Sequence, residues 1–236
     1  MSPFIAEFIG TAVLILLGNG VVANVVLTKT KGNGSGWIVI AFGWAMAVFT
    51  GVYISAAASG AHLNPAVTIA LAIKTADWSN VPLYLLAQML GAMFGSLLVW
   101  LSYRQHFDAT SDGNLQMAAF CTAPAIRSPL NNFISEMIAT CVFILCVLFL
   151  TPAEAKLGSM DALPVALLVL AIGLSLGGTT GYAINTARDL GPRIMHFILP
   201  IKNKRNSDWA YAWIPLTATV SGSVLAALLY QLITAH

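Results

Sequence analysis

The sequence predicts an all-α polytopic membrane protein, with six transmembrane helices and two re-entrant half-helices in an inverted repeat. Composition is the first reason: 58% of the 236 residues are hydrophobic and 8% are charged, against about 25% charged residues in ordinary globular domains. The second reason is length, because a spanning helix takes roughly 20 apolar residues and apolar stretches fill most of the chain. The third is a similarity between the two halves. A large soluble domain is excluded, and the net charge of +2 gives no reason to expect nucleic acid as a partner.

Six apolar stretches are long enough to cross a bilayer, and two shorter ones are interrupted by polar residues. The expected spans are Phe4 to Leu27, Trp37 to Ala58, Val81 to Tyr103, Leu130 to Leu150, Leu163 to Gly178 and Trp209 to Ile233. The interrupted stretches, Ser59 to Ile73 and Thr179 to Phe197, are too short to span, so each is predicted to enter and return as a half-helix. We expect one transmembrane channel domain, 1–236, with repeat one at about 1–103, a polar loop at 104–128 and repeat two at about 129–236.

The two halves share their order of segments and two short motifs. Glu7 in AEFIGTAVLIL and Glu136 in SEMIATCVFIL sit at matching places, and SGAHLNPAV matches TGYAINTAR in the half-helices. Because three spans is an odd number, the second copy enters the membrane from the opposite side. The half-helices should therefore meet near the middle, around an aqueous path, since exposed non-helical backbone is not tolerated in lipid.

An asparagine precedes the helical part of each half-helix: Asn64 before Pro65, and Asn185 before Thr186. Asparagine is a favoured N-cap, whose side-chain oxygen accepts from an amide two or three residues on. We expect its NH2 group to be free to donate into the pore. Either asparagine alone is adequately explained as a plain cap in a loop, but their pairing across the repeat favours a pore-lining role for both.

The motifs SGAHLNPAVT and GYAINTARDLGPR, set in six spans with an inverted repeat, resemble the major intrinsic protein family of aquaporins and glycerol facilitators over essentially the whole chain. Asp189 after Arg188, then Arg193 and the Pro215-Leu216 pair, resemble the aquaglyceroporin branch. The resemblance implies an aquaporin-like homotetramer in the cell membrane, with both termini cytoplasmic and a pore in each protomer. It implies passive conduction of glycerol and other small uncharged solutes, with ions and protons excluded. Water, dihydroxyacetone, urea, hydrogen peroxide and undissociated lactic acid are further candidate solutes.

The resemblance also places a selectivity filter on four residues: Trp44, Gly173, Tyr182 and Arg188. Trp44 and Tyr182 offer aromatic faces to the CH groups of a polyol, while Arg188 offers donors to its hydroxyls. Gly173 is expected to leave width. The general account of aquaporin-type pores assigns the exclusion of cations and protons to such an arginine and to the positive ends of half-helices.

Backbone carbonyls are expected, by the same resemblance, to line the acceptor side of the pore. They belong to Gly60, Ala61, His62 and Leu63 in the first repeat, and to Gly181, Tyr182 and Ala183 in the second.

Four charged residues are interpreted as structural support. Asp189 and Arg193 stand four apart, in the order that favours an ion pair on a helix. Glu7 and Glu136 are expected to accept hydrogen bonds from the backbone of the re-entrant loops. The alternative, in which one of them relays protons, would make the chain a proton-coupled solute carrier.

A water-selective pore is the other alternative, and Gly173 and Asp189 disfavour it. No nucleophile, nucleotide loop or cofactor motif appears, and no other histidine or cysteine has ligand spacing near His62. We therefore expect neither an enzyme, nor a cofactor, nor a metal site.

Two residues depart from the family pattern. Thr186 stands where the family usually has proline, and we hypothesise that its amide adds a donor near the pore centre. Tyr182 stands where glycerol channels more often have phenylalanine, so its hydroxyl narrows the filter and adds a polar group.

Loop charge opposes the orientation that the resemblance implies. Only Lys74 and Lys156 would be cytoplasmic, against seven basic residues outside, contrary to the positive-inside tendency. The seven are Lys29, Lys31, Arg104, Arg127, Lys202, Lys204 and Arg205. We favour the family orientation, with a basic outer mouth, because loop charge is a bias that other signals outweigh.

Overall fold

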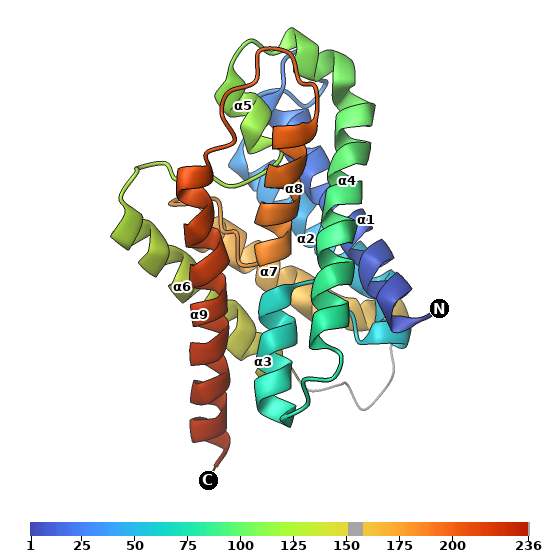
Figure 1. Ribbon diagram of the computed structural model, residues 1–236, viewed down its shortest axis with the longest axis vertical. Helices are drawn as coiled ribbons and strands as arrows, with labels where there is room; N and C mark the ends of the chain where they lie inside the picture. The colour runs from blue at the N-terminus through green and yellow to red at the C-terminus, as the bar shows by residue number, and fades with distance from the viewer. Residues whose placement is uncertain (151–157, 236) are drawn as a thin grey trace.

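The computed structural model describes residues 1–150 and 158–235, and these residues form helices and loops with no strand (Figure 1). In chain order the helices are α1 (Pro3–Val26), α2 (Trp37–Ser59), α3 (Pro65–Thr75), α4 (Val81–Ala109), α5 (Gly113–Ala118), α6 (Pro129–Phe149), the 3-10 helix η1 (Gly158–Ala162), α7 (Leu163–Ser175), α8 (Thr186–Ile198) and α9 (Trp209–Thr234). The predicted all-α fold class is confirmed.

Five helices are long and apolar enough to cross a membrane: α1, α2, α4, α6 and α9. The sixth predicted span is shorter, since α7 has 13 residues and a rise of about 20 Å. The five residues of η1 add about 10 Å at the steeper rise of a 3-10 helix. Together they reach roughly the 30 Å thickness of the hydrocarbon core.

The two half-helices α3 and α8 start in the middle of the molecule and run toward opposite ends, α8 upward and α3 downward (Figure 1). Each begins at an asparagine N-cap, and Pro65 occupies the first turn of α3, where its missing N–H costs nothing. At the far end of α8, Lys204 Nζ donates to the carbonyls of His196 and Leu199 at 2.9 and 2.7 Å.

Glycines at matching positions set the helix packing in both halves. A Cβ atom on Gly91 of α4 would lie 2.4 Å from the Phe8 carbonyl oxygen of α1, and one on Gly222 of α9 would lie 2.5 Å from the Met137 carbonyl oxygen of α6. Only glycine permits these approaches. The first and last long helices of each half therefore pack alike, as the inverted repeat predicts.

The segment predicted as a polar loop, 104–128, is partly helical. It contains the last six residues of α4 and all of α5, which Asp112 caps by accepting from the Asn114 amide at 2.8 Å. Gln116 Nε2 donates to the carbonyls of Phe107, Thr110 and Lys202, at 2.8 to 2.9 Å, and so joins this segment to the loop after α8. Polar composition indicated exposure here, and an exposed helix satisfies it as well as a loop does.

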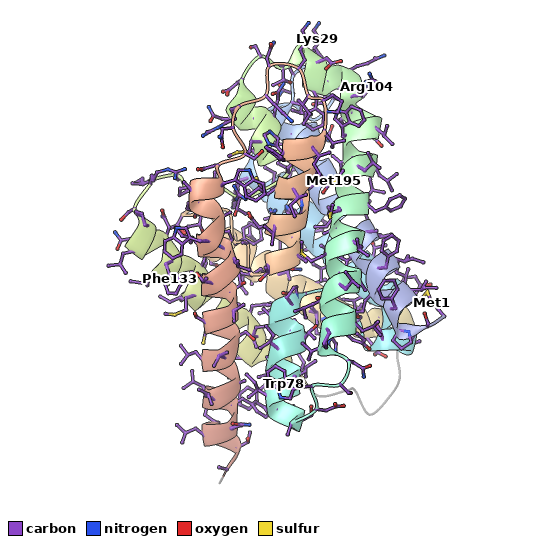
Figure 2. The ribbon with its side chains drawn as sticks, viewed as in Figure 1. Met1, Lys29, Trp78, Arg104, Phe133 and Met195 are labelled. Carbon is purple, nitrogen blue, oxygen red and sulfur yellow. The ribbon has the colours of Figure 1, made fainter. Side chains whose placement is uncertain are left out.

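The basic loops gather at one end of the molecule. Figure 2 labels Lys29 and Arg104 together at the top, while Trp78 and the C-terminal end of α9 lie toward the bottom. Lys156, which the sequence analysis predicts to be cytoplasmic, lies outside the described residues.

Candidate pore and selectivity filter

Two loops lead into α3 and α8 with the same unusual backbone conformation. Each has positive φ angles at the residues four, three and one before its asparagine. These residues are Gly60 (79°), Ala61 (52°) and Leu63 (51°) in the first loop, and Gly181 (85°), Tyr182 (39°) and Ile184 (42°) in the second. A left-handed conformation costs a non-glycine residue roughly 1–2 kcal/mol, so both loops need support from the surrounding structure.

Glu7, fully buried on α1, supports the first loop. Its Oε1 accepts from the His62 amide at 2.9 Å, and its Oε2 accepts from the Leu63 amide at 2.7 Å. The Ser59 hydroxyl and the Gln88 side-chain amide also donate to it, at 2.6 and 2.8 Å. Four donors match the four lone-pair sites that the two oxygens of a carboxylate offer.

Glu136 of α6 supports the second loop in the same way. It is 1% exposed and accepts from the amides of Ala183 and Ile184, at 3.0 and 3.3 Å, and from the side chain of Thr180. The loop amides at the equivalent positions in both repeats are thus held from behind by a carboxylate.

The two asparagines cap their half-helices by accepting from backbone amides at different positions. Asn64 Oδ1 accepts from the Ala66 amide at 2.9 Å, two residues on, whereas Asn185 Oδ1 accepts from the Arg188 amide at 3.2 Å, three residues on. Both are N-cap bonds of the expected kind.

The same asparagines also cross-link the two repeats. Asn64 Nδ2 donates to the Ile184 carbonyl, and Asn185 Nδ2 donates to the Leu63 carbonyl, both at 2.9 Å. The expectation that the NH2 groups are free is therefore corrected: one hydrogen of each is used across the repeat, which leaves one to donate into the pore.

A cavity of about 170 Å³ lies where the half-helices meet. Ten of the sixteen residues singled out from the sequence line it: Trp44, Gly60, Ala61, His62, Leu63, Asn64, Tyr182, Ala183, Asn185 and Arg188. Gly173 and Gly181, both expected at the pore, are not among its lining residues, and Glu7, Glu136, Asp189 and Arg193 lie behind it.

Sequence reasoning missed Ile184 and most of the apolar lining. Val48 and Val52 follow Trp44 by four and eight residues on α2, and Val165 and Val169 precede Gly173 by eight and four on α7. Helical spacing from the filter positions is the signal that would have found them.

Arg188 and two aromatic rings form the polar end of the cavity. Arg188 is 7% exposed, and its guanidinium carbon lies 4.3 Å from the centroid of the Trp44 ring. Arg188 Nη1 and the Tyr182 hydroxyl are both buried with no hydrogen-bond partner among the described residues. The part of Arg188 that remains exposed can donate to a hydrogen-bonding solute or to water at this end of the cavity.

The role expected for Gly173 is corrected by its surroundings. A Cβ atom there would lie 3.0 Å from the Tyr182 hydroxyl, so the space that Gly173 leaves is occupied by the Tyr182 ring. Gly177 makes the same room, because its Cβ would lie 2.4 Å from Tyr182 Cδ1. Gly173 thus shapes the filter by accommodating Tyr182 rather than by contacting the cavity.

Trp37 is a filter neighbour that sequence reasoning did not identify. Its indole Nε1 donates to the Gly173 carbonyl at 2.9 Å, and its ring meets that of Tyr182 edge-on, with centroids 5.8 Å apart. Trp37 does not line the cavity.

Asp189 and Arg193 tie α8 to two loops. Asp189 Oδ2 accepts from the amide and the hydroxyl of Thr122, at 2.7 and 2.6 Å. Asp189 Oδ1 pairs with Arg193 Nη2 at 2.8 Å. Arg193 donates onward to the carbonyls of Ser207 and Thr122, at 2.8 and 2.9 Å. Both charged side chains are at most 2% exposed, so the geometry is that of a structural pair.

Thr186 faces away from the cavity. Its hydroxyl lies 2.7 Å from that of Thr219, which donates to the Pro215 carbonyl at 2.8 Å, so Thr186 is the donor between the two threonines. Thr186 is not a lining residue. The hypothesis that it adds a donor to the pore therefore loses its support.

His62 separates the cavity from a second depression, of about 340 Å³, at the end where α3 turns into α4. His62 Nδ1 lies 3.1 Å from the Thr68 hydroxyl, and its ring packs against Tyr84. Asp77 lines the rim, where hydrogen bonds from the Ser79 hydroxyl and amide lower the pKa of its carboxyl. That end therefore keeps an ionised carboxylate at neutral pH.

Comparisons with known proteins agree with this geometry. A model of the family described as Major intrinsic protein matches residues 1–230. The glycerol uptake facilitator protein of Streptococcus pneumoniae is 52% identical over 98% of this chain and 99% of its own length. The probable glycerol uptake facilitator protein of Thermotoga maritima gives the same values. The X-ray structure of the aquaglyceroporin from Plasmodium falciparum matches with a TM-score of 0.84 and 35% identity, over 98% of this chain and 96% of that one. With its paired asparagine caps, duplicated loops and buried filter arginine, the chain belongs to the major intrinsic protein family.

Proposed function

We propose that the chain is a passive channel that conducts glycerol and other small uncharged solutes through the cavity between its half-helices. The observation that carries the proposal is the meeting of the Arg188 side chain with the rings of Trp44 and Tyr182 in the lining of a mostly apolar cavity. A polyol has hydroxyls for the polar groups and CH groups for the rings. The glycerol facilitators among its relatives support the same solute class.

Passage requires no covalent chemistry. A solute exchanges hydrogen bonds with Arg188, and then with the remaining N–H of Asn64 and Asn185 farther along the cavity. Valines on α2 and α7 form the opposite wall, so each position offers few partners, and a solute that binds weakly also leaves readily.

Exclusion of ions follows from the unbalanced charge of Arg188. The equivalent residue of the first repeat is Val67, so one positive charge faces the cavity with no lining carboxylate beside it. A cation meets both this charge and the positive N-terminal ends of α3 and α8.

A proton-coupled carrier would need a carboxylate that gains and loses protons on the solute path. Glu7 and Glu136 are instead buried outside the cavity lining and are used by loop amides. We therefore place both residues in the scaffold of a channel and assign no enzymatic step to the chain.

As part of the proposal, the protein is a homotetramer with both termini cytoplasmic, and the chain 1–236 is one channel domain in two repeats. Six crossings return the chain to its starting side, which supports a shared side for the termini. Four of the seven basic residues placed outside are engaged: Lys204 at the end of α8, Arg127 with Asp208, Arg205 with Asn114 and Arg104 over the Trp100 ring. Cross-linking in membranes tests the tetramer, and cysteine labelling at Lys31 in intact cells tests the side.

The functional test is stopped-flow light scattering on proteoliposomes, comparing water, glycerol and lactic acid at two pH values. Glycerol flux that does not saturate and ignores an imposed proton gradient is expected. Water flux without glycerol flux would establish the water-selective alternative, and saturable flux driven by the proton gradient would establish a carrier.

A further inference from the structure

Trp37 contacts two of the four filter positions from outside the cavity. It stands at the first residue of α2, and its indole reaches the end of α7 and the second re-entrant loop. The indole is 38% exposed, so burial alone does not explain its contacts.

The acceptor for Trp37 exists because α7 ends early. The last four carbonyls of a helix have no partner within it, and α7 ends at Ser175, so the Gly173 carbonyl is one of these. Trp37 Nε1 donates to it at 2.9 Å, which fixes the end of α7 against the start of α2.

The Tyr182 ring is held in a slot between α7 and Trp37. Gly173 lies against the Tyr182 hydroxyl, which would be 3.0 Å from a Cβ atom on Gly173. Gly177 lies against the ring edge, since its Cβ atom would be 2.4 Å from Tyr182 Cδ1. Trp37 closes the third side, since a Cβ on Gly177 would also lie 2.8 Å from Trp37 Cζ2. The ring therefore cannot move away from the cavity while Trp37 stays in place.

We propose that Trp37 is a positioning residue for selectivity: by fixing the end of α7 and backing the Tyr182 ring, it sets the width of the filter. The inference rests on the proposed function, because it concerns which solutes the same pore admits. A smaller ring at position 37, without the N–H donor, gives Tyr182 room to retreat and so widens the filter. A methyl group at position 177 pushes Tyr182 toward the cavity and narrows it.

The test compares two variants with opposite expected signs. Trp37→Phe should raise the ratio of glycerol to water permeability about three-fold or more, as expected for the loss of one partly buried hydrogen bond. Gly177→Ala should lower the same ratio by a similar factor. Both ratios are measured by stopped-flow light scattering, and the ratio is independent of how much folded protein each vesicle contains.

A double variant separates action through Tyr182 from a general structural effect. In a Tyr182→Ala background the ring that Trp37 backs is gone, so adding Trp37→Phe should change the ratio less than about 1.5-fold, a clear departure from additivity. The matched control is Trp213→Phe, another half-exposed tryptophan, which stacks on Phe133 away from the filter. It should leave the ratio unchanged.

An unchanged ratio in Trp37→Phe, a shift of the same sign in Gly177→Ala, or full additivity with Tyr182→Ala would overturn the proposal. If Trp37→Phe yields no folded protein, Gly177→Ala decides the matter through its sign. Failure of the proposed function is seen separately, as wild-type vesicles that pass water but no glycerol. The role of Trp37 is then measured on the ratio of hydrogen peroxide to water.

Discussion

Aligned on Asn64 and Asn185, the loop and half-helix of the first repeat match those of the second in backbone conformation and differ in their side chains. Positive φ angles recur at the same three positions, and a buried glutamate accepts from the same two amides. The helix that follows carries Val67 and Thr68 in the first repeat, but Arg188 and Asp189 in the second.

The difference shows that both repeats supply the same loop scaffold, whereas three of the four filter positions, Gly173, Tyr182 and Arg188, belong to the second repeat. Either loop can present carbonyls and an asparagine amide, since that depends on backbone geometry. Only the second repeat carries the charge that faces the cavity and the ion pair that anchors it. The Asp189–Arg193 network belongs to the second repeat alone, because the first repeat has Thr68 and Ala72 at those positions, which cannot form an ion pair.

The largest expected effect breaks that network. Arg193→Met removes one partner of a fully buried pair and should destabilise the protein by about 3–5 kcal/mol, because it leaves Asp189 charged and two loop carbonyls unpaired. The loss is measured as the fraction of folded protein after heating, by size-exclusion chromatography in detergent. Arg104→Met, which removes an exposed guanidinium stacked over Trp100, is the control and should change little. Equal losses of folded protein for Arg193→Met and Arg104→Met would mean that the buried network contributes no more to stability than an exposed arginine does.

The next effect tests whether the scaffold is truly duplicated. Glu7→Gln and Glu136→Gln each replace one acceptor oxygen by a donor, so each strands a loop amide and should cost about 1–3 kcal/mol. The two losses of thermal stability should agree closely, since the same two amides are involved in each repeat. If one variant were as stable as the wild type while the other unfolded, the two glutamates would not support their loops in equivalent ways.

A smaller effect makes the second half-helix resemble the first. Arg188→Val gives α8 the residue found at the equivalent position of α3, and it removes the charge from the cavity. We expect glycerol flux to persist while proton leak rises about ten-fold, the equivalent of 1.4 kcal/mol, a modest value for a unit charge near a pathway. A pH-sensitive dye inside proteoliposomes measures the leak under an imposed potassium gradient. Unchanged proton exclusion would show that the half-helix ends suffice without the arginine.

The smallest effect concerns the proline that the second repeat lacks. Thr186→Pro gains about 0.4–1 kcal/mol from the stiffer unfolded chain and loses one hydrogen bond to Thr219 worth about as much. Stability and all solute ratios should therefore stay close to the wild type in the same heating and stopped-flow assays. A selective change for one solute would restore the hypothesis that the Thr186 amide takes part in the pore.

The spans and half-helices could be predicted from the sequence because membrane segments obey a single strong rule of length and polarity. Bounds agreed within a few residues except at two places. α4 continues to Ala109, since polar residues beyond the membrane continue a helix as readily as they form a loop. α7 ends at Ser175, three residues before the predicted limit and just ahead of the pair Gly177 and Gly178.

The candidate site was predictable where it depends on motifs and not where it depends on contacts between distant segments. Asn64, Asn185, Trp44, Tyr182 and Arg188 are placed by spacing within recognisable motifs, and all line the cavity. Gly173, by contrast, was assigned to the pore, although it is covered by the Tyr182 ring. Trp37 was missed because its partner lies 136 residues away along the chain, and no local pattern reports such a contact.

The cross-repeat bonds of the two asparagines have a consequence for biogenesis. Asn64 finds its carbonyl partner 120 residues downstream, and Asn185 reaches 122 residues back. While the first half is already inserted and the second is still being synthesised, Asn64 lacks its partner, so the pore centre is completed only when α8 docks. Neither half contains a channel by itself, and the two halves expressed as separate chains should conduct only after they find each other in the bilayer.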